Sequence, residues 1–151
     1  MRLKDKVAIV TGSGRGLGKG IAMKLAEEGA KVVVADMAPA DDTVAEIVAK
    51  GGTASAFAVN VSKQEEVHAL VKYAIDTYGT LDIMVNNAGI NRDGMLHKMP
   101  VENWQMVIDV DLTGVFFGTQ EALKHMRAQG SGRIINISSG SWLGNIGQAN
   151  Y

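Results

Sequence analysis

Cysteine is absent from this chain of 151 residues, so neither a disulfide bond nor a thiolate metal site can form. The absence also fits a reducing compartment. No apolar run approaches the roughly 20 residues that a membrane span needs. The basic start MRLKDK is not followed by the long apolar segment and cleavage site of a secretory signal. We therefore expect a cytoplasmic protein that does not have a membrane as partner.

An excess of charge of either sign is lacking too. The formal net charge is −1, which gives no electrostatic reason to expect nucleic acid as partner. Hydrophobic residues make up 46% of the chain and charged residues 21%, as in a soluble globular protein. The length suits one domain that covers residues 1–151.

Short runs rich in valine and isoleucine recur along the chain and are typical of largely buried strands. Glycine is abundant, at 18 of 151 residues, and most glycines lie between these runs, where the chain must turn. The expected strands are VAIVTG (7–12), KVVVAD (31–36), TASAFAVNV (53–61), LDIMVNNAG (81–89) and RIINIS (133–138).

Helical patterns separate the expected strands. Leu17, Ile21 and Leu25 recur every four residues, which predicts the buried stripe of a first helix. We expect further helices at 41–50, at 62–78 and at 101–129, the last with a bend near Thr113-Gly114. The apolar stripe of the third consists of Val67, Leu70, Val71, Ala74, Ile75 and Tyr78.

Residues Ser62 to Glu65 have the pattern of a capping box, in which the serine and glutamate side chains satisfy each other's free amides. Strand and helix in alternation imply right-handed crossovers between parallel strands. The sequence thus predicts an α/β fold: a doubly wound, Rossmann-type parallel sheet with helices on both faces.

The segment TGSGRGLG (11–18) lies between the first strand and the first helix, where a phosphate-binding turn belongs. Gly12 could make the tight turn, Gly16 could let the backbone approach a pyrophosphate, and Gly18 could let helix and strand pack closely. The alternative is a glycine-rich loop that only turns the chain.

Asp36 ends the second strand, 18 residues after Gly18, where an acid is expected to bind the adenosine ribose. A 2′-phosphate would face this charge, and two unit charges ~4 Å apart repel by about 4 kcal/mol at an effective dielectric of 20. Arg15 would instead favour NADP(H), because a guanidinium can pair with that phosphate. We expect NAD(H) as the preferred cofactor, with NADP(H) as the alternative.

Three motifs together resemble the short-chain dehydrogenase/reductase family. They are Thr11-Gly12-x-x-x-Gly16-x-Gly18, NNAG at 86–89 and NISS (136–139) followed by Tyr151. Within the family the chain is similar to the 3-oxoacyl-(acyl-carrier-protein) reductases. The resemblance implies hydride transfer between a nicotinamide cofactor and a secondary alcohol or ketone, such as a 3-oxoacyl thioester.

The resemblance also assigns roles to residues of the cofactor site. Thr11 and Asn86 to Gly89 would brace the fold and line the adenine-ribose side of the cleft. Asn60 and Val61 would border the adenine, although the family usually has an aspartate at the position of Asn60. The full set implied to bind the cofactor is Gly12, Ser13, Gly14, Arg15, Gly16, Leu17, Gly18, Asp36, Asn60, Val61, Asn87, Ala88 and Gly89.

By the same resemblance Tyr151 is the general acid/base, and a serine at the end of the fifth strand holds the carbonyl oxygen. Counting along the strand selects Ser139, and counting back from the tyrosine selects Ser138. We prefer Ser139, because strand register is more constrained than loop length.

Asp111 stands where the family commonly has an asparagine that helps hold a proton-relay water. An ionised aspartate could accept a hydrogen bond from this water but could not donate one. We expect an altered relay and a steeper dependence of activity on pH.

The family's tyrosine is followed, four residues on, by a lysine that lowers its pKa, and this sequence has no residue after Tyr151. We therefore expect the 151 residues to be the N-terminal part of a longer chain with roughly another hundred residues, its C-terminal strands and helices. We expect these residues alone to be inactive.

The resemblance implies a homo-oligomer, a dimer or tetramer, that associates through the helix at 101–129. His68, His97 and His125 lack metal-ligand spacing, so we predict no metal site. Two alternatives stay open: a non-catalytic nucleotide-binding fragment or redox-sensing module, and another enzyme class on the same fold, such as a methyltransferase or a sugar epimerase.

Overall fold

A computed structural model describes all residues, Met1–Tyr151. Five parallel strands form one sheet in the order β3-β2-β1-β4-β5. The strands are β1 (Val7–Thr11), β2 (Lys31–Asp36), β3 (Thr53–Ala58), β4 (Ile83–Asn86) and β5 (Arg133–Asn136). The doubly wound parallel sheet predicted from the sequence is confirmed, although β3, β4 and β5 are shorter than expected.

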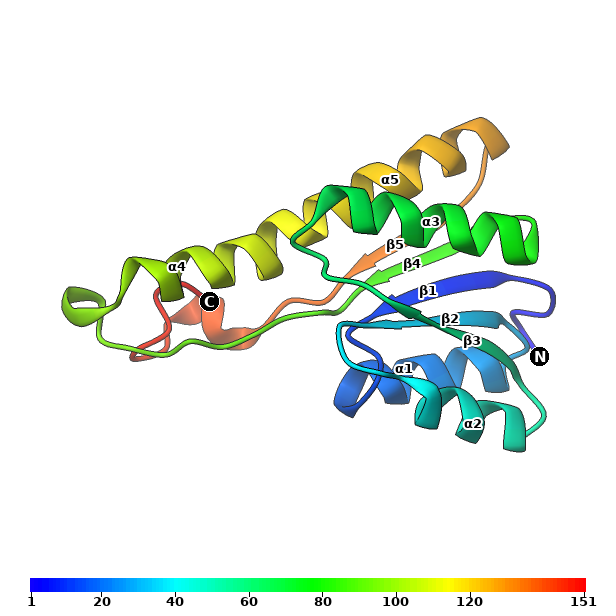
Figure 1. The fold of residues 1–151 in the computed structure, drawn as a ribbon, viewed down its shortest axis with the longest axis horizontal. Coiled ribbons are helices and arrows are strands. Elements are labelled where there is room, and N and C mark those ends of the chain that lie inside the picture. The colour runs from blue at the N-terminus through cyan, green and yellow to red at the C-terminus, as the bar shows by residue number, and fades with distance from the viewer.

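Helices cover both faces of the sheet (Figure 1). The helices are α1 (Gly16–Glu27), α2 (Asp41–Ala49), α3 (Gln64–Tyr78), α4 (Val101–Val107) and α5 (Gly114–Gln129). Alternate residues of β1 enter two separate apolar clusters: Val7 and Ile9 pack with residues of α3 and α5, and Ala8 and Val10 with residues of α1 and α2. This alternation follows from the two-residue period of a strand.

The buried stripe predicted for α1 is wrong at Leu17, which is 66% exposed. Ile21 and Leu25 are partly buried against the core, and the buried residues of the helix are Gly18, Ala22 and Ala26. A β-carbon at Gly18 would lie 2.2 Å from the carbonyl oxygen of Gly12, so only glycine fits there without a shift of the backbone. Close packing of the helix on the sheet therefore selects small residues over leucine.

The capping box predicted at Ser62 is also wrong. Helix α3 begins at Gln64, and its N-cap, Lys63, makes no side-chain cap bond. The Ser62 hydroxyl donates to Asn60 Oδ1 (2.8 Å), and the Asn60 amide donates to Glu66 Oε2 (2.7 Å). The serine and a glutamate both take part in the turn, but Asn60 is the partner of each.

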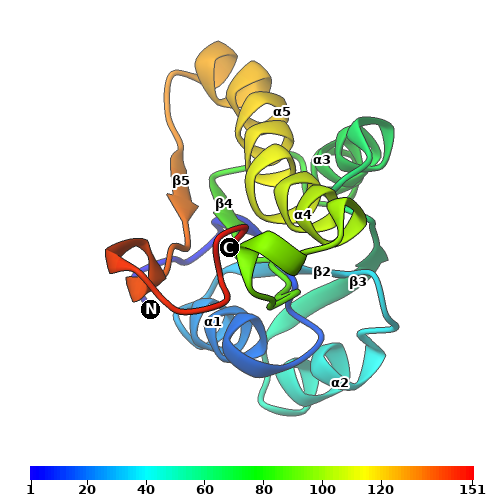
Figure 2. The same cartoon turned by 90° about the vertical axis from the view of Figure 1, so that its left-hand side faces the viewer.

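The outer strands are less buried than their apolar sequences predict. β3 and β5 form the two edges of the sheet, and Ile135 and Ile137 are 45% and 38% exposed. In Figure 2, β5 lies at the flank of the sheet, away from α1. The expectation of a largely buried strand does not hold for β5, because β5 has a partner strand on one side only.

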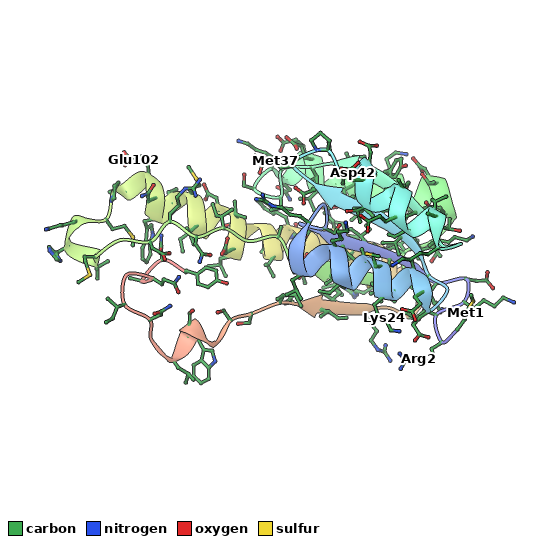
Figure 3. The ribbon with its side chains drawn as sticks, turned by 90° about the horizontal axis from the view of Figure 1, so that it is seen from below. Met1, Arg2, Lys24, Met37, Asp42 and Glu102 are labelled. Atoms are coloured by element: carbon green, nitrogen blue, oxygen red, sulfur yellow. The ribbon has the colours of Figure 1, made fainter.

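A six-residue π-helical segment, Ile108–Thr113, joins α4 to α5. The bend predicted near Thr113-Gly114 thus falls at the end of a stretch with altered helical winding. Residues 87–113 and 137–151 form an arm that extends beyond the carboxyl ends of the strands (Figure 1). Figure 3 places Glu102, on this arm, at the opposite end of the molecule from Met1 and Arg2. No helix is long and apolar enough to cross a membrane.

Candidate functional site

A cleft of about 500 Å³ opens at the carboxyl ends of the strands, where the base of the arm meets the sheet. Chain order reverses here, because β2 and β3 lie on one side of β1 and β4 and β5 on the other. Such a switch point is where doubly wound sheets bind their ligands. Both the glycine turn and the C-terminal segment contribute to the wall of this cleft.

The glycine turn has the geometry of an anion-binding loop. Gly12 and Gly16 have φ values of 63° and 58°, in the left-handed region that favours glycine. The N-cap of α1, Arg15, makes no side-chain cap bond, and the first turn holds no acid. The first amides of α1 are therefore left for an anion, which the helix dipole also favours.

Asp36 faces this turn from the end of β2. Its Oδ2 accepts from the Gly14 amide (2.9 Å) and its Oδ1 from the Ala38 amide (3.1 Å). These two bonds fix the carboxylate at the cleft wall, which Arg15 also lines. Each carboxylate oxygen retains capacity to accept a further hydrogen bond, for example from a hydroxyl group.

Not all residues of the predicted turn point into the cleft. Ser13 is fully buried: its hydroxyl donates to Val10 O (2.6 Å) and accepts from the Ala35 amide (3.1 Å). Ser13, Gly14 and Gly16 do not line the cleft, whereas Gly12, Arg15, Leu17 and Gly18 do. The Ser13 side chain ties β1 to β2 and so supports the turn from behind.

Asn60 and Val61 line the cleft at the end of the segment after β3. The Asn60 oxygen that could accept a bond from an adenine amino group already accepts from Ser62, through the amide (3.1 Å) and the hydroxyl. Only the Asn60 side-chain amino group has no protein partner. A ligand at Asn60 would thus meet a donor, whereas the aspartate that the family usually has at this position would offer an acceptor.

Thr11 and Asn87 connect the glycine turn to the segment after β4. Thr11 Oγ1 accepts from the amides of Asn87 (3.0 Å) and Ala88 (3.1 Å), and Asn87 Nδ2 donates to Thr11 O and Gly12 O. Asn87, Ala88 and Gly89 line the cleft beside the turn. Asn86 is buried and donates to Asn136 Oδ1 (2.8 Å), which couples β4 to β5.

Asp111 lies in the π-helical segment, and its Oδ1 accepts from the Ile90 amide (2.9 Å). Burial raises the pKa of the Asp111 carboxyl above its ordinary value, and the bond from Ile90 opposes this only in part. Its Oδ2 lies beside Gly89, at 3.4 Å from where a β-carbon of that glycine would stand. Asp111 thus holds the loop at the cleft, and its neighbour Val110 lines the wall.

The three candidate catalytic hydroxyls, those of Ser138, Ser139 and Tyr151, all line the same cleft. Ser139 Oγ accepts from the Ser141 amide and donates to the Ser141 hydroxyl, both at 3.2 Å. The hydroxyls of Ser138 and Tyr151 have no protein partner. Tyr151 is 42% exposed, so its phenol can reach a ligand in the cleft.

Sequence reasoning missed several residues of the cleft wall. Their shared signal is position: each follows a strand or lies on the loop that a strand end supports. They are Met37, Val59, Ile90, Asn91 and Ile137. Val110, beside Asp111 in the π-helical segment, is a sixth missed residue.

Glu121 of α5 was missed as well, and it lies outside the cleft. Its carboxylate is 4% exposed and accepts from Lys124 Nζ (2.6 Å), with His68 Nδ1 3.1 Å away. Burial would raise the pKa of Glu121, but the bonds from Lys124 and His68 outweigh it and hold this pKa below its ordinary value. No group of three or more histidine and acidic side chains is arranged to hold a metal ion.

The family model described as short chain dehydrogenase matches residues 6–151. A 3-oxoacyl-(acyl-carrier-protein) reductase of Synechocystis sp. is 50% identical over 153 aligned residues, which cover 99% of this chain and 62% of the relative. The reductase FabG of Staphylococcus aureus, named for the same substrate, is 47% identical, with 97% and 61% covered. Glucose 1-dehydrogenase 2 of Bacillus subtilis is 46% identical, with 91% and 55% covered.

A crystal structure of a short chain dehydrogenase from Mycobacterium avium superposes with a TM-score of 0.96 at 39% identity. The match covers 100% of this chain and 58% of the other. The chain therefore spans about three fifths of the length of the relatives that it matches.

Proposed function

This chain belongs to the short chain dehydrogenase family, and we propose that the protein is an oxidoreductase that interconverts a secondary alcohol and a ketone. A bound nicotinamide cofactor would supply or accept the hydride. One observation carries the proposal: a single cleft is lined by the glycine turn and Asp36 and also by Ser138, Ser139 and Tyr151. Groups suited to a dinucleotide and groups suited to a carbonyl oxygen therefore share one site.

The cofactor would be held by backbone groups of the turn and by Asp36. The free amides at the start of α1 suit a pyrophosphate. A β-carbon at Gly12 would lie 2.8 Å from Ala88 Cα and one at Gly18 would lie 2.2 Å from Gly12 O, so glycine at both positions lets the turn pack closely on its neighbours. The Asp36 carboxylate suits the two ribose hydroxyls, with Asn87, Ala88 and Gly89 beside them.

We propose NAD(H) as the preferred cofactor, because a 2′-phosphate would meet the Asp36 carboxylate before it could pair with Arg15. Titration calorimetry of the whole protein with NADH and with NADPH tests this, and we expect NADH to bind several-fold more tightly. Asp36→Asn should reduce the ratio between the Kd values for NADPH and NADH. Asp42→Asn, an equal charge change on exposed α2, should leave this ratio unchanged. Tighter binding of NADPH by the unmodified protein would refute the NAD(H) preference.

For the proton step, we propose that Tyr151 acts as general acid and base at the carbonyl oxygen. A tyrosine has a reference pKa of about 10, so it needs a nearby cation to work near neutrality. Ser139 would donate a hydrogen bond to the same oxygen, with Ser138 as the alternative. Comparing kcat of Ser138→Ala and Ser139→Ala decides between the two, because the residue that holds the oxygen should lose roughly 10²-fold or more.

We further propose that Asp111 alters the family's proton relay. A carboxylate that already accepts from the Ile90 amide can accept from a water but cannot donate to it while ionised. The pH–rate profile of Asp111→Asn should be flatter than that of the unmodified enzyme. Identical profiles would remove Asp111 from the relay.

As substrate we propose a 3-oxoacyl thioester, which the names of two relatives support. The alternative substrate class is a sugar, as in the relative named glucose 1-dehydrogenase 2. Turnover of a short 3-oxoacyl thioester against that of glucose, each with both cofactors, separates these classes. Binding of NADH without turnover of any carbonyl compound would favour a nucleotide-binding or redox-sensing module.

We also propose that the protein is a homodimer or tetramer that associates through α5. Phe116 and Leu123 on this helix are 55% and 41% exposed, which is unusual for large apolar side chains on a helix that packs on a sheet. The mass in solution, from light scattering, tests this, and Leu123→Lys should shift the protein toward monomer. A monomeric unmodified protein would contradict the assembly.

A further inference from the structure

The segment 140–151 is bound to the loop after β4 through polar groups. The Gly94 amide donates to Gly147 O (2.8 Å), and Gln148 Nε2 donates to Asp93 Oδ2 (3.1 Å). These groups are exposed or half-buried, so water competes for their hydrogen bonds. We therefore expect these bonds to contribute little to the stability of this contact.

Asn150 makes a third connection, and its environment is different. Its side chain is 6% exposed, although it lies directly before the half-exposed Tyr151. Asn150 Nδ2 donates to Arg92 O (2.9 Å) and to Asn103 O (3.3 Å). One buried amide therefore joins three segments: the loop after β4, the start of α4 and the residues that carry Tyr151.

The orientation of this amide is set by its surroundings. Both protons of Nδ2 are directed at backbone carbonyls, and Oδ1 is buried without a partner. Turning the side chain by 180° would place Oδ1 against two carbonyl oxygens and lose both bonds. The site thus requires two donors from one side chain, which only an amide or a cation can provide.

We propose that Asn150 is a positioning residue for Tyr151: it locks the backbone of Tyr151 to the loop after β4 and to α4, and so fixes where the phenol meets the substrate. The catalytic part of this proposal rests on the proposed function. Tyr151 itself has no protein partner for its hydroxyl, so its placement depends on its backbone. Asn150 is the nearest residue that anchors this backbone in a buried site.

The test uses the whole protein and three forms: unmodified, Asn150→Ala and Asn145→Ala. Asn145 is the matched control, because it is an exposed amide of the same segment that donates only to Gln148 (2.7 Å). We expect Asn150→Ala to lower kcat roughly 10- to 100-fold, as a displacement of about 1 Å of a reacting group does. The Kd for the cofactor should stay within about twofold, because Asn150 does not line the cleft.

Hydrogen exchange provides a readout that does not depend on activity. In the unmodified protein the side-chain amide protons of Asn150 should exchange much more slowly than those of Asn145, as seen by NMR. This measurement stands even if Asn150→Ala fails to fold. Equal exchange at the two side chains, or a kcat of Asn150→Ala within twofold of the unmodified value, would overturn the proposal.

The two proposals can fail separately. An unmodified protein without oxidoreductase turnover would refute the proposed function and the catalytic part of this one. Slow exchange at Asn150 in the same protein would still support the lock. Turnover combined with fast exchange at Asn150 would leave the function standing and remove the lock.

Discussion

The sheet with its four flanking helices and the arm are built on different physical principles. Of the 34 buried residues, only Val107 and Asn150 lie in the arm, residues 87–113 and 137–151. The core of the sheet consists of side chains such as Ile9 and Leu70, which are completely buried. The arm is held instead by hydrogen bonds between side chains and the backbone of its own loops: Asp111 accepts from the Ile90 amide, and Asn150 donates to Arg92 O.

This difference bears on the proposed division of roles between the two regions. Apolar burial makes the sheet rigid, so the glycine turn and Asp36 are presented in a fixed geometry. The arm carries Ser138, Ser139 and Tyr151, which line the cleft, and the roles that we propose for them require accessible hydroxyls. Changes in the arm should therefore affect turnover, and changes in the sheet should affect stability.

Tyr151→Phe should have the largest effect. It removes one hydroxyl from the arm, and kcat of the whole protein should fall roughly 10²- to 10⁴-fold, the usual contribution of general acid–base catalysis. Melting temperature and cofactor Kd should hardly change. If the variant lost cofactor affinity as well as kcat, the arm and the sheet would not have the separate roles that we propose.

Leu70→Ala should produce the opposite pattern. Leu70 is completely buried between α3 and the sheet, and its truncation should lower the free energy of unfolding by roughly 2–5 kcal/mol. The matched change in the arm is Leu96→Ala, where the side chain is 67% exposed and the expected change is within about 0.5 kcal/mol. Urea unfolding of both variants checks this, and similar losses would refute the contrast.

Gly18→Ala and Gly20→Ala sharpen the contrast within α1. A β-carbon at Gly18 would lie 2.2 Å from Gly12 O, so we expect a loss of roughly 1–3 kcal/mol and weaker cofactor binding. A β-carbon at Gly20 meets nothing within 4 Å, and alanine there should add up to about 1 kcal/mol through its helix propensity. Thermal unfolding of the pair should therefore show shifts of opposite sign.

Asp111→Asn should have the smallest effect of these changes, and this effect is on how the free energy of unfolding varies with pH. Burial raises the pKa of this carboxyl, so the folded chain binds its proton more tightly than the unfolded chain, whose value is about 3.9. The stability of the unmodified protein relative to the variant must then fall as pH rises from about 3.9 through the raised value.

Asparagine can still accept from the Ile90 amide, so the variant should be more stable by less than ~1 kcal/mol at pH 7. The gain should vanish below about pH 4, where the aspartate is protonated. Unfolding curves of both proteins at pH 7 and below about pH 4 measure this difference in stability. A larger gain for the variant at acid pH would contradict a raised pKa of Asp111 in the folded chain.

Much of the fold could be predicted because its signals are local. The alternation of strand and helix, the turn at 12–18 and the stripe of α3 from Val67 to Ala74 depend on patterns within a few residues. The approach of Asp36 to Gly14 could be predicted in kind, because Asp36 ends β2 and Gly14 follows β1, the neighbouring parallel strand. The sequence by itself therefore determined the class of fold and the residues of the glycine turn.

Burial and long-range contact were decided by the tertiary structure. Whether Leu17 or Gly18 faces the sheet depends on how closely α1 approaches Gly12, and the exposure of Ile135 depends on the place of β5 at the sheet edge. Asn150 meets Arg92 and Asn103 across 58 and 47 residues of chain. A local pattern carries no information on such partners, because the free energy of burial and of a buried hydrogen bond depends on groups that only the folded chain brings together.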